Sequence, residues 1–137
     1  MIPVDTGGPG DVGGDLDIHV DRVSPATAVF TLVGEADLHR APALREEIAE
    51  VIDDGIHDLV VDLSEVTFID SMTLGVLLGA MKRLRPLGGR LCVVVNDPNI
   101  RRIFEITLLD RVFPLYEDTE RALVGLAAAA ERSGGNG

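Results

Sequence analysis

Four residues of contrasting chemistry separate a predicted strand from a predicted helix: Asp70, Ser71, Met72 and Thr73, in the stretch FIDSMTLGVLLGAMKRL. A serine at a helix start can act as the N-cap, because its hydroxyl accepts a hydrogen bond from an amide of the first turn. The unpaired amides and partial positive charge of a helix start also favour a phosphate. The residue types alone therefore leave two interpretations of Ser71 open, a phosphorylated hydroxyl or simply a good cap.

Asp70 and Met72, the residues on either side of Ser71, each have two possible roles as well. We expect Asp70 to hold the loop by accepting backbone amides, or else to bind a partner directly, because its carboxylate stands where unpaired amides gather. Met72 is apolar at a loop tip, where it could contact a partner or fold back onto the core. A flexible thioether side chain suits either role, since it adapts to irregular surfaces.

The elements that must position this loop follow from the hydropathy pattern. The pattern predicts strands at 16–23, 27–35, 57–66, 90–96 and 112–117, and helices at 41–54, 72–84, 98–106 and 118–131. Alternating strands and helices favour a mostly parallel sheet, whose functional loops follow the carboxyl ends of the strands. The continuous apolar runs at 59–61 and 91–95 predict adjacent buried parallel strands, whereas the alternation at 16–23 predicts a strand at or near an edge.

Composition narrows the class of protein. The chain has 137 residues, of which 46% are hydrophobic and 26% charged, as in a soluble globular protein. We expect one domain over residues 15–131, between disordered tails at 1–14 and 132–137. The net charge of −11 disfavours nucleic acid and anionic membranes as direct partners.

The single cysteine and the absence of a signal peptide predict a cytoplasmic protein. Cys92 cannot form an intrachain disulfide, and its apolar run LCVVV predicts a small buried side chain rather than a reactive thiol. The first residues lack the basic segment and apolar stretch of a secretory signal.

No catalytic motif or metal-ligand spacing stands out, so we predict no enzyme activity, no metal and no cofactor. The three histidines, His19, His39 and His57, are far apart in sequence and are expected at the surface. Asp62 ends a predicted central strand, as in a response-regulator receiver, but Lys82 lies in a predicted helix rather than at the end of a late strand. We expect Asp62 to accept loop amides instead.

Three segments together resemble the STAS family of anti-sigma factor antagonists, over about residues 16–130: GEADLHRAPALREEI, LVVDLSEVTFIDSMTLGVLLGAMKRLRPLGGRLCVVV and IRRIFEITLLDRVFPLYED. The resemblance implies the α/β STAS fold, a mixed, mostly parallel β-sheet with helices packed mainly on one face. It also implies a protein that binds a serine-kinase anti-sigma factor and so frees a sigma factor for transcription.

Members of this family are switched off by phosphorylation in an Asp-Ser-Ser/Thr-Gly-Leu-Gly motif. Asp70 and Ser71 match its first two residues, and residues 74–75 match its last two. Met72 falls on the phosphoacceptor and cannot accept phosphate, while Thr73 falls on the glycine. The resemblance therefore implies a binding protein without the usual switch residue, unless Thr73 or Ser71 has replaced it.

We predict a binding module, monomeric or weakly dimeric, whose partner is an anti-sigma factor of the serine-protein kinase type. The alternative is a STAS signalling module that binds a non-kinase partner or a stressosome-type assembly. The predicted partner-binding surface consists of Asp37, Asp70, Ser71, Met72, Thr73, Leu74, Gly75, Asn96 and Asp97.

Overall fold

The fold is an α/β sandwich built on a five-stranded sheet, and the computed structural model describes residues 16–135. The elements are β1 (Leu16–Arg22), β2 (Thr27–Ala36), α1 (Ala41–Asp53), β3 (Asp58–Ile69), α2 (Ser71–Leu84), β4 (Arg90–Val94), α3 (Pro98–Ile106), β5 (Leu115–Tyr116) and α4 (Thr119–Gly135). Two short 3-10 turns lie at Arg85–Leu87 and Leu109–Arg111. The tail predicted at 1–14 lies outside the described residues.

The sheet has the strand order β1-β2-β3-β4-β5, with β1 antiparallel to β2 and every other neighbouring pair parallel. The two apolar runs are confirmed as adjacent parallel strands, because Leu59 pairs with Leu91 and Val61 with Val93. The alternating segment is confirmed as an edge strand, β1. The carboxyl ends of β2, β3 and β4 consequently face the same end of the molecule.

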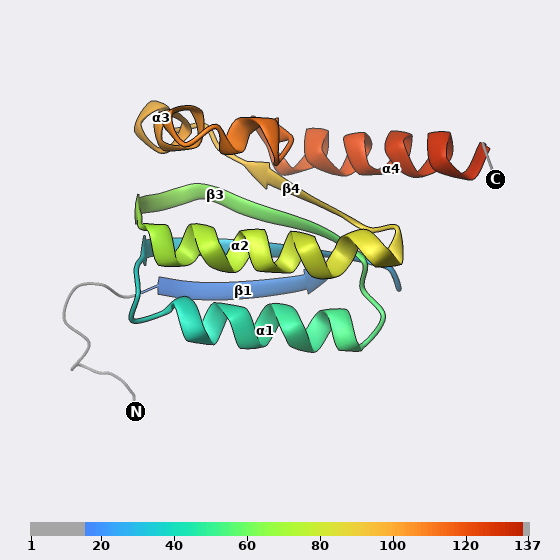
Figure 1. The fold of residues 1–137 in the computed structure, drawn as a ribbon, viewed down its shortest axis with the longest axis horizontal. Coiled ribbons are helices and arrows are strands. Elements are labelled where there is room, and N and C mark those ends of the chain that lie inside the picture. The colour runs from blue at the N-terminus through green and yellow to red at the C-terminus, as the bar shows by residue number, and fades with distance from the viewer. Residues whose placement is uncertain (1–15, 136–137) are drawn as a thin grey trace.

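Helices cover both faces of the sheet unequally. The larger core joins alternate residues of β2, β3 and β4, such as Phe30, Val61 and Val93, to α1, α2 and α3. The smaller core packs Val60 and Cys92, with their neighbours on that face, against α4. Figure 1 shows α1 and α2 side by side across one face of the sheet. The prediction of helices mainly on one face is confirmed.

Some predicted boundaries are wrong by a few residues. Strand β3 continues to Ile69, because it pairs with β2 as far as the Ala36–Ile69 pair. Strand β5 is only two residues long, since Pro114 has no amide hydrogen to donate before it. Helix α4 continues to Gly135, so the backbone of residues 132–135 is helical where a tail was predicted.

Candidate functional site

The start of α2 is capped by Asp70 and not by Ser71. Asp70 has extended backbone angles, and its Oδ1 accepts a hydrogen bond from the amide of Thr73 at 3.1 Å. This confirms that Asp70 holds the loop through a backbone amide. Ser71 is instead the first residue of the helix and is exposed. The prediction that Ser71 caps the helix is therefore wrong: the preceding carboxylate reaches the orphan amide and also complements the positive end of the helix.

Thr73 faces inward and joins α2 to the neighbouring strand. Its hydroxyl donates to the carbonyl of Ala36 at 2.9 Å, and only 1% of the residue is exposed. The same carbonyl accepts the amide of Asp70 at 3.1 Å. The end of β2 and the start of α2 are thus held together by two hydrogen bonds to one oxygen. A phosphate on Thr73 would require this buried hydroxyl to leave its partner.

Met72 points away from the core, with half of its surface exposed (50%). Of its two interpretations, the one in which it folds back onto the core does not hold. Two further large apolar residues are exposed near the ends of the adjoining strands, Phe68 in β3 at 48% and Leu38 after β2 at 56%. Neither was predicted as part of the site. Leu38 could have been suspected as an isolated apolar residue between Asp37 and His39, but no pattern places Phe68 outward.

Asp37 shapes the turn that leads from β2 into α1. Its Oδ1 accepts the amide of His39 at 3.0 Å, and its carbonyl accepts the amides of Arg40 and Ala41 at 3.1 and 3.0 Å. Because Ala36 pairs with Ile69, Asp37 and Asp70 both follow directly from one pair of neighbouring residues in the sheet. The structure therefore brings together these two predicted site residues.

The loop at Asn96 and Asp97 also follows the carboxyl end of a strand, but this strand ends earlier than β3. Asp97 caps α3 by accepting the amide of Asn99 at 2.8 Å, and Asn96 is exposed. Strand β4, however, pairs with β3 only as far as Val94 opposite Asp62, whereas β3 continues to Ile69. The turn at Asp37 and the start of α2 are thus contiguous, because they follow the paired strands β2 and β3. The loop at residues 96–97 follows the shorter strand β4.

Comparison with known proteins agrees with this architecture. A family model of the STAS domain matches residues 19–122, more than half of the sequence. The chain belongs to the STAS domain family. The resemblance inferred from the three sequence segments is confirmed.

The relatives of this STAS domain carry a consistent name. The anti-sigma-B factor antagonist of Staphylococcus aureus (strain NCTC 8325 / PS 47) is 34% identical over 87 residues, which cover 64% of this chain and 81% of the relative. The crystal structure of an anti-sigma factor antagonist from Mycobacterium paratuberculosis is 33% identical, with a TM-score of 0.77 over 85% of this chain and 97% of that one.

A more distant neighbour supports the fold alone. The Bacillus cell fate determinant SpoIIAA, solved in its phosphorylated form, has 24% identity and a TM-score of 0.64, and the match covers 78% of this chain and 96% of that one.

Asp62 of this STAS domain is bonded to two other residues. Asp62 accepts the amide of Ser64, which lies within β3, at 2.9 Å and the hydroxyl of Thr119 at 3.1 Å. The prediction that it accepts loop amides is therefore wrong, because its partners are a strand amide and a side-chain hydroxyl. Within residues 16–135, no three His, Cys, Asp or Glu side chains are grouped to hold a metal ion. In the same range, no helix has the length and apolar character needed to cross a membrane. The loops at the carboxyl ends of β2, β3 and β4 are held by hydrogen bonds to Asp37, Asp70 and Asp97.

Cys92 is buried in the smaller core, as predicted. Burial, with a further contribution from the charge of Asp58, raises the pKa of the Cys92 thiol from 9.0 to about 12, although Arg90 acts in the opposite direction. The thiol stays protonated at neutral pH and is a poor nucleophile.

Proposed function

We propose that this STAS domain binds an anti-sigma factor of the serine-protein kinase type, competes with the sigma factor for it, and so regulates transcription. The contact surface in this proposal lies at the carboxyl ends of β2, β3 and β4 and consists of Asp37, Asp70, Ser71, Met72, Gly75, Asn96 and Asp97. Thr73 and Leu74, which were predicted as part of it, are buried and hold the start of α2 from the inner side. The names of its relatives support the class of partner. The exposed apolar residues Leu38, Phe68 and Met72 near that surface support a protein contact, because such side chains gain most from removal from water.

The observation that carries the proposal is the position of Met72. It lies half-exposed in the first turn of α2, where the family motif has a phosphorylatable hydroxyl. A phosphate adds about −1.5 to −2 charges, which an interface must desolvate. A thioether adds none, so Met72 resembles the unmodified, binding-competent state. We propose that the domain binds its partner regardless of kinase activity.

Ser71 is the better of the two substitute acceptors. Its residue is exposed, whereas the hydroxyl of Thr73 is buried and bonded to the Ala36 carbonyl. Phosphorylation at Ser71 with loss of binding would mean that the switch has moved by one residue rather than disappeared.

The first experiment identifies the partner. The tagged domain is used to capture proteins from its native lysate, and mass spectrometry is used to name them. A captured anti-sigma factor with a kinase fold, displaced from its sigma factor by the added domain on a sizing column, supports the proposal. Capture of a phosphatase or of stressosome-type components favours the alternative, a STAS module in another signalling assembly.

The second experiment tests the switch. Wild type, Met72→Ser and Ser71→Ala are each incubated with the purified partner and ATP, and phosphate is located by mass spectrometry. We expect phosphate only on Met72→Ser, accompanied by loss of partner binding. Stoichiometric phosphate on wild-type Ser71 or Thr73, with release of the partner, contradicts the proposal of a missing switch.

A further inference from the structure

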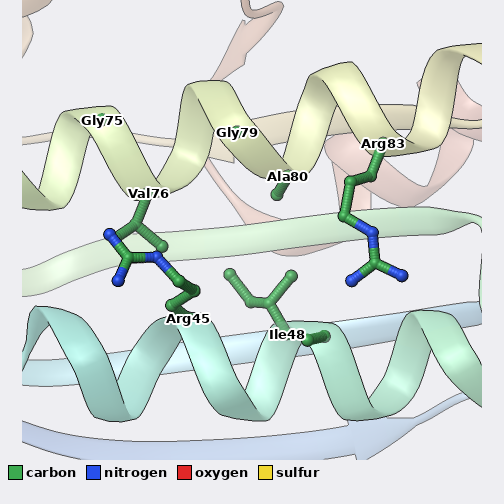
Figure 2. A pocket seen from close by; sticks show the side chains of 8 residues that line it. Arg45, Ile48, Gly75, Val76, Gly79, Ala80 and Arg83 are labelled. Carbon is green, nitrogen blue, oxygen red and sulfur yellow. The ribbon is translucent and has the colours of Figure 1, made fainter.

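A groove with a cavity volume of ≈ 160 Å³ runs between α1 and α2, behind the predicted contact surface. Ile48 of α1 and Val76 of α2 line its apolar part, and the exposed Gly75 and Gly79 form one lip. Figure 2 shows the guanidinium of Arg45 toward the Gly75–Val76 end and that of Arg83 toward the opposite end. The groove is therefore an apolar slot with a positive charge at each end.

The domain's own fold does not require the two glycines on this lip. A Cβ atom added at Gly75 or Gly79 would meet nothing within 4 Å, and neither residue has a positive φ. Glycine inside a helix is less favourable than alanine, because it loses more backbone freedom on folding. Their bare backbone leaves room for a second chain to approach α2 closely.

The groove continues the predicted contact surface along one side of α2. At about 100° per residue, Met72, Gly75, Gly79 and Arg83 fall on the same side of the helix. A partner that contacts Met72 can thus extend along α2 into the groove without leaving this side.

The charges select the kind of occupant. In a chain of net charge −11, two arginines at the ends of one apolar slot are a local exception. Arg45 forms no ion pair with any residue of the described range, while Arg83 pairs with Asp53 at 2.9 Å. That pair is solvent-exposed on both sides, at 47% and 69%, so it exchanges easily for another carboxylate.

The dimensions exclude most small ligands. Small-molecule pockets enclose roughly 300–1,000 Å³. This slot is closer to the cavity of about 150 Å³ that admits one benzene-sized group. It therefore fits one or two aliphatic side chains presented by a larger molecule. From Val76 to Arg83 the helix rises about 10 Å, which equals two turns of a second helix lying alongside.

We infer that the groove docks an acidic amphipathic helix of the partner protein, with carboxylates seven residues apart for Arg45 and Arg83 and an aliphatic residue between them for the apolar slot. The inference deepens the proposed function and rests on it only for the identity of the partner. It adds a second contact to the one at Met72.

The test uses a defined probe and the full chain. The probe is a 21-residue alanine-based helical peptide with two Glu seven positions apart and Leu at the third and fourth positions after the first Glu; the matched control has Lys in place of both Glu. Backbone and methyl NMR spectra of the labelled protein are recorded during each titration. We expect the Glu peptide to shift the resonances of Gly75, Gly79 and Ile48, and the Lys peptide to leave them unchanged.

Variants of the protein locate the binding. Gly79→Leu fills the slot and should weaken peptide binding about tenfold, whereas Ala127→Leu on the exposed side of α4 should not. Arg45→Glu should weaken it about threefold to tenfold, with a loss that shrinks in high salt, and Arg102→Glu on α3 is the matched charge control.

Three results overturn the inference. The first is an absence of shifts at the groove with excess Glu peptide. The second is a dimer, seen by sedimentation, that Gly79→Leu dissociates, because the occupant is then a second copy. The third is a shift of residues 1–15 in Gly79→Leu without peptide, because the occupant is then the chain's own N-terminal segment.

The same variants separate this inference from the proposed function. If the captured anti-sigma factor loses binding to Met72→Glu but binds Gly79→Leu like wild type, the groove is not a docking site and the proposed function stands. If no anti-sigma factor is captured but the Glu peptide binds the groove as expected, the proposed function fails and the inference stands.

Discussion

The two sides of α2 differ in what the fold demands of them. The inner side carries Leu74, Leu77 and Leu84, all buried, and Thr73, whose hydroxyl is bonded to β2. The outer side carries Met72, Gly75 and Gly79, all exposed. One helix is thus fixed on one side by packing and hydrogen bonding, while its other side is free to be shaped by a partner. Substitutions on the two sides should therefore affect stability and binding separately.

The largest effect is expected from Leu77→Ala on the inner side. Leu77 is completely buried, so its truncation should cost about 2–5 kcal/mol of unfolding free energy through lost burial and a cavity. Urea denaturation followed by circular dichroism measures the change. Met72→Ala, at a residue of the outer side that is 50% exposed, is the control and should change stability by less than about 0.5 kcal/mol. Equal losses from both would contradict the division between the two sides.

Asp70→Ala should lower the unfolding free energy by about 1 kcal/mol, because the Thr73 amide loses its cap. Asp70→Asn should lose less, since asparagine caps almost as well as aspartate. The same denaturation experiment compares the two variants. If Asp70→Ala leaves both stability and partner binding unchanged, the role assigned to this residue is wrong.

Gly79→Ala should raise the unfolding free energy by roughly 0.5–1 kcal/mol, because the outer side has space for the methyl group and alanine favours the helix. Gly89→Ala is the contrasting control: its Cβ would collide with the backbone carbonyl of His57, which cannot swing aside, so it should destabilise. Thermal unfolding of both variants measures the sign. A loss of stability in Gly79→Ala would mean that the outer side is constrained by the fold after all.

Met72→Glu should have the smallest effect on folding and still abolish function. A carboxylate in the first turn of α2 suits the helix dipole, so stability should stay within about 0.5 kcal/mol of wild type or rise slightly. Binding to the captured anti-sigma factor should be lost, because a charge enters a desolvated contact. Calorimetric titration of the partner measures binding, and Met72→Leu is the neutral control. Full binding by Met72→Glu would remove Met72 from the proposed contact.

The sequence predicted the central sheet well because periodicity determines it. Continuous apolar runs placed β3 and β4 side by side, and the alternation in β1 placed it at the edge. The choice between Asp70 and Ser71 as the cap could not be made from residue type, because both are good caps and a shift of one residue separates them.

The outward position of Phe68 could not be predicted for a different reason. Strand β3 carries an extra residue at each of two register shifts against β2, between Thr31 and Val33 and between Gly34 and Glu35. Each extra residue reverses the inward and outward alternation, so the period of two fails between the shifts, where Val66 joins the larger core, and the second shift restores it at Ile69. Phe68 therefore shares a face with Val60, which is buried in the smaller core, and the sequence does not show that this core ends before Phe68. The inward hydroxyl of Thr73 likewise depends on the Ala36 carbonyl, which is remote in sequence.

The protonated, buried thiol of Cys92 has a practical consequence for spectroscopy. Thiolates are the nucleophiles that attack maleimide and thiol-reactive nitroxide reagents, and a thiol with a pKa of about 12 in the smaller core presents almost no thiolate at neutral pH. A cysteine introduced at an exposed position away from the proposed contact surface, for example Val124→Cys in α4, is therefore the preferred site of labelling in the native fold, with Cys92 left in place. Fluorescence or electron-spin distances from that label to a partner can then be measured in a domain that differs from the natural one by a single residue.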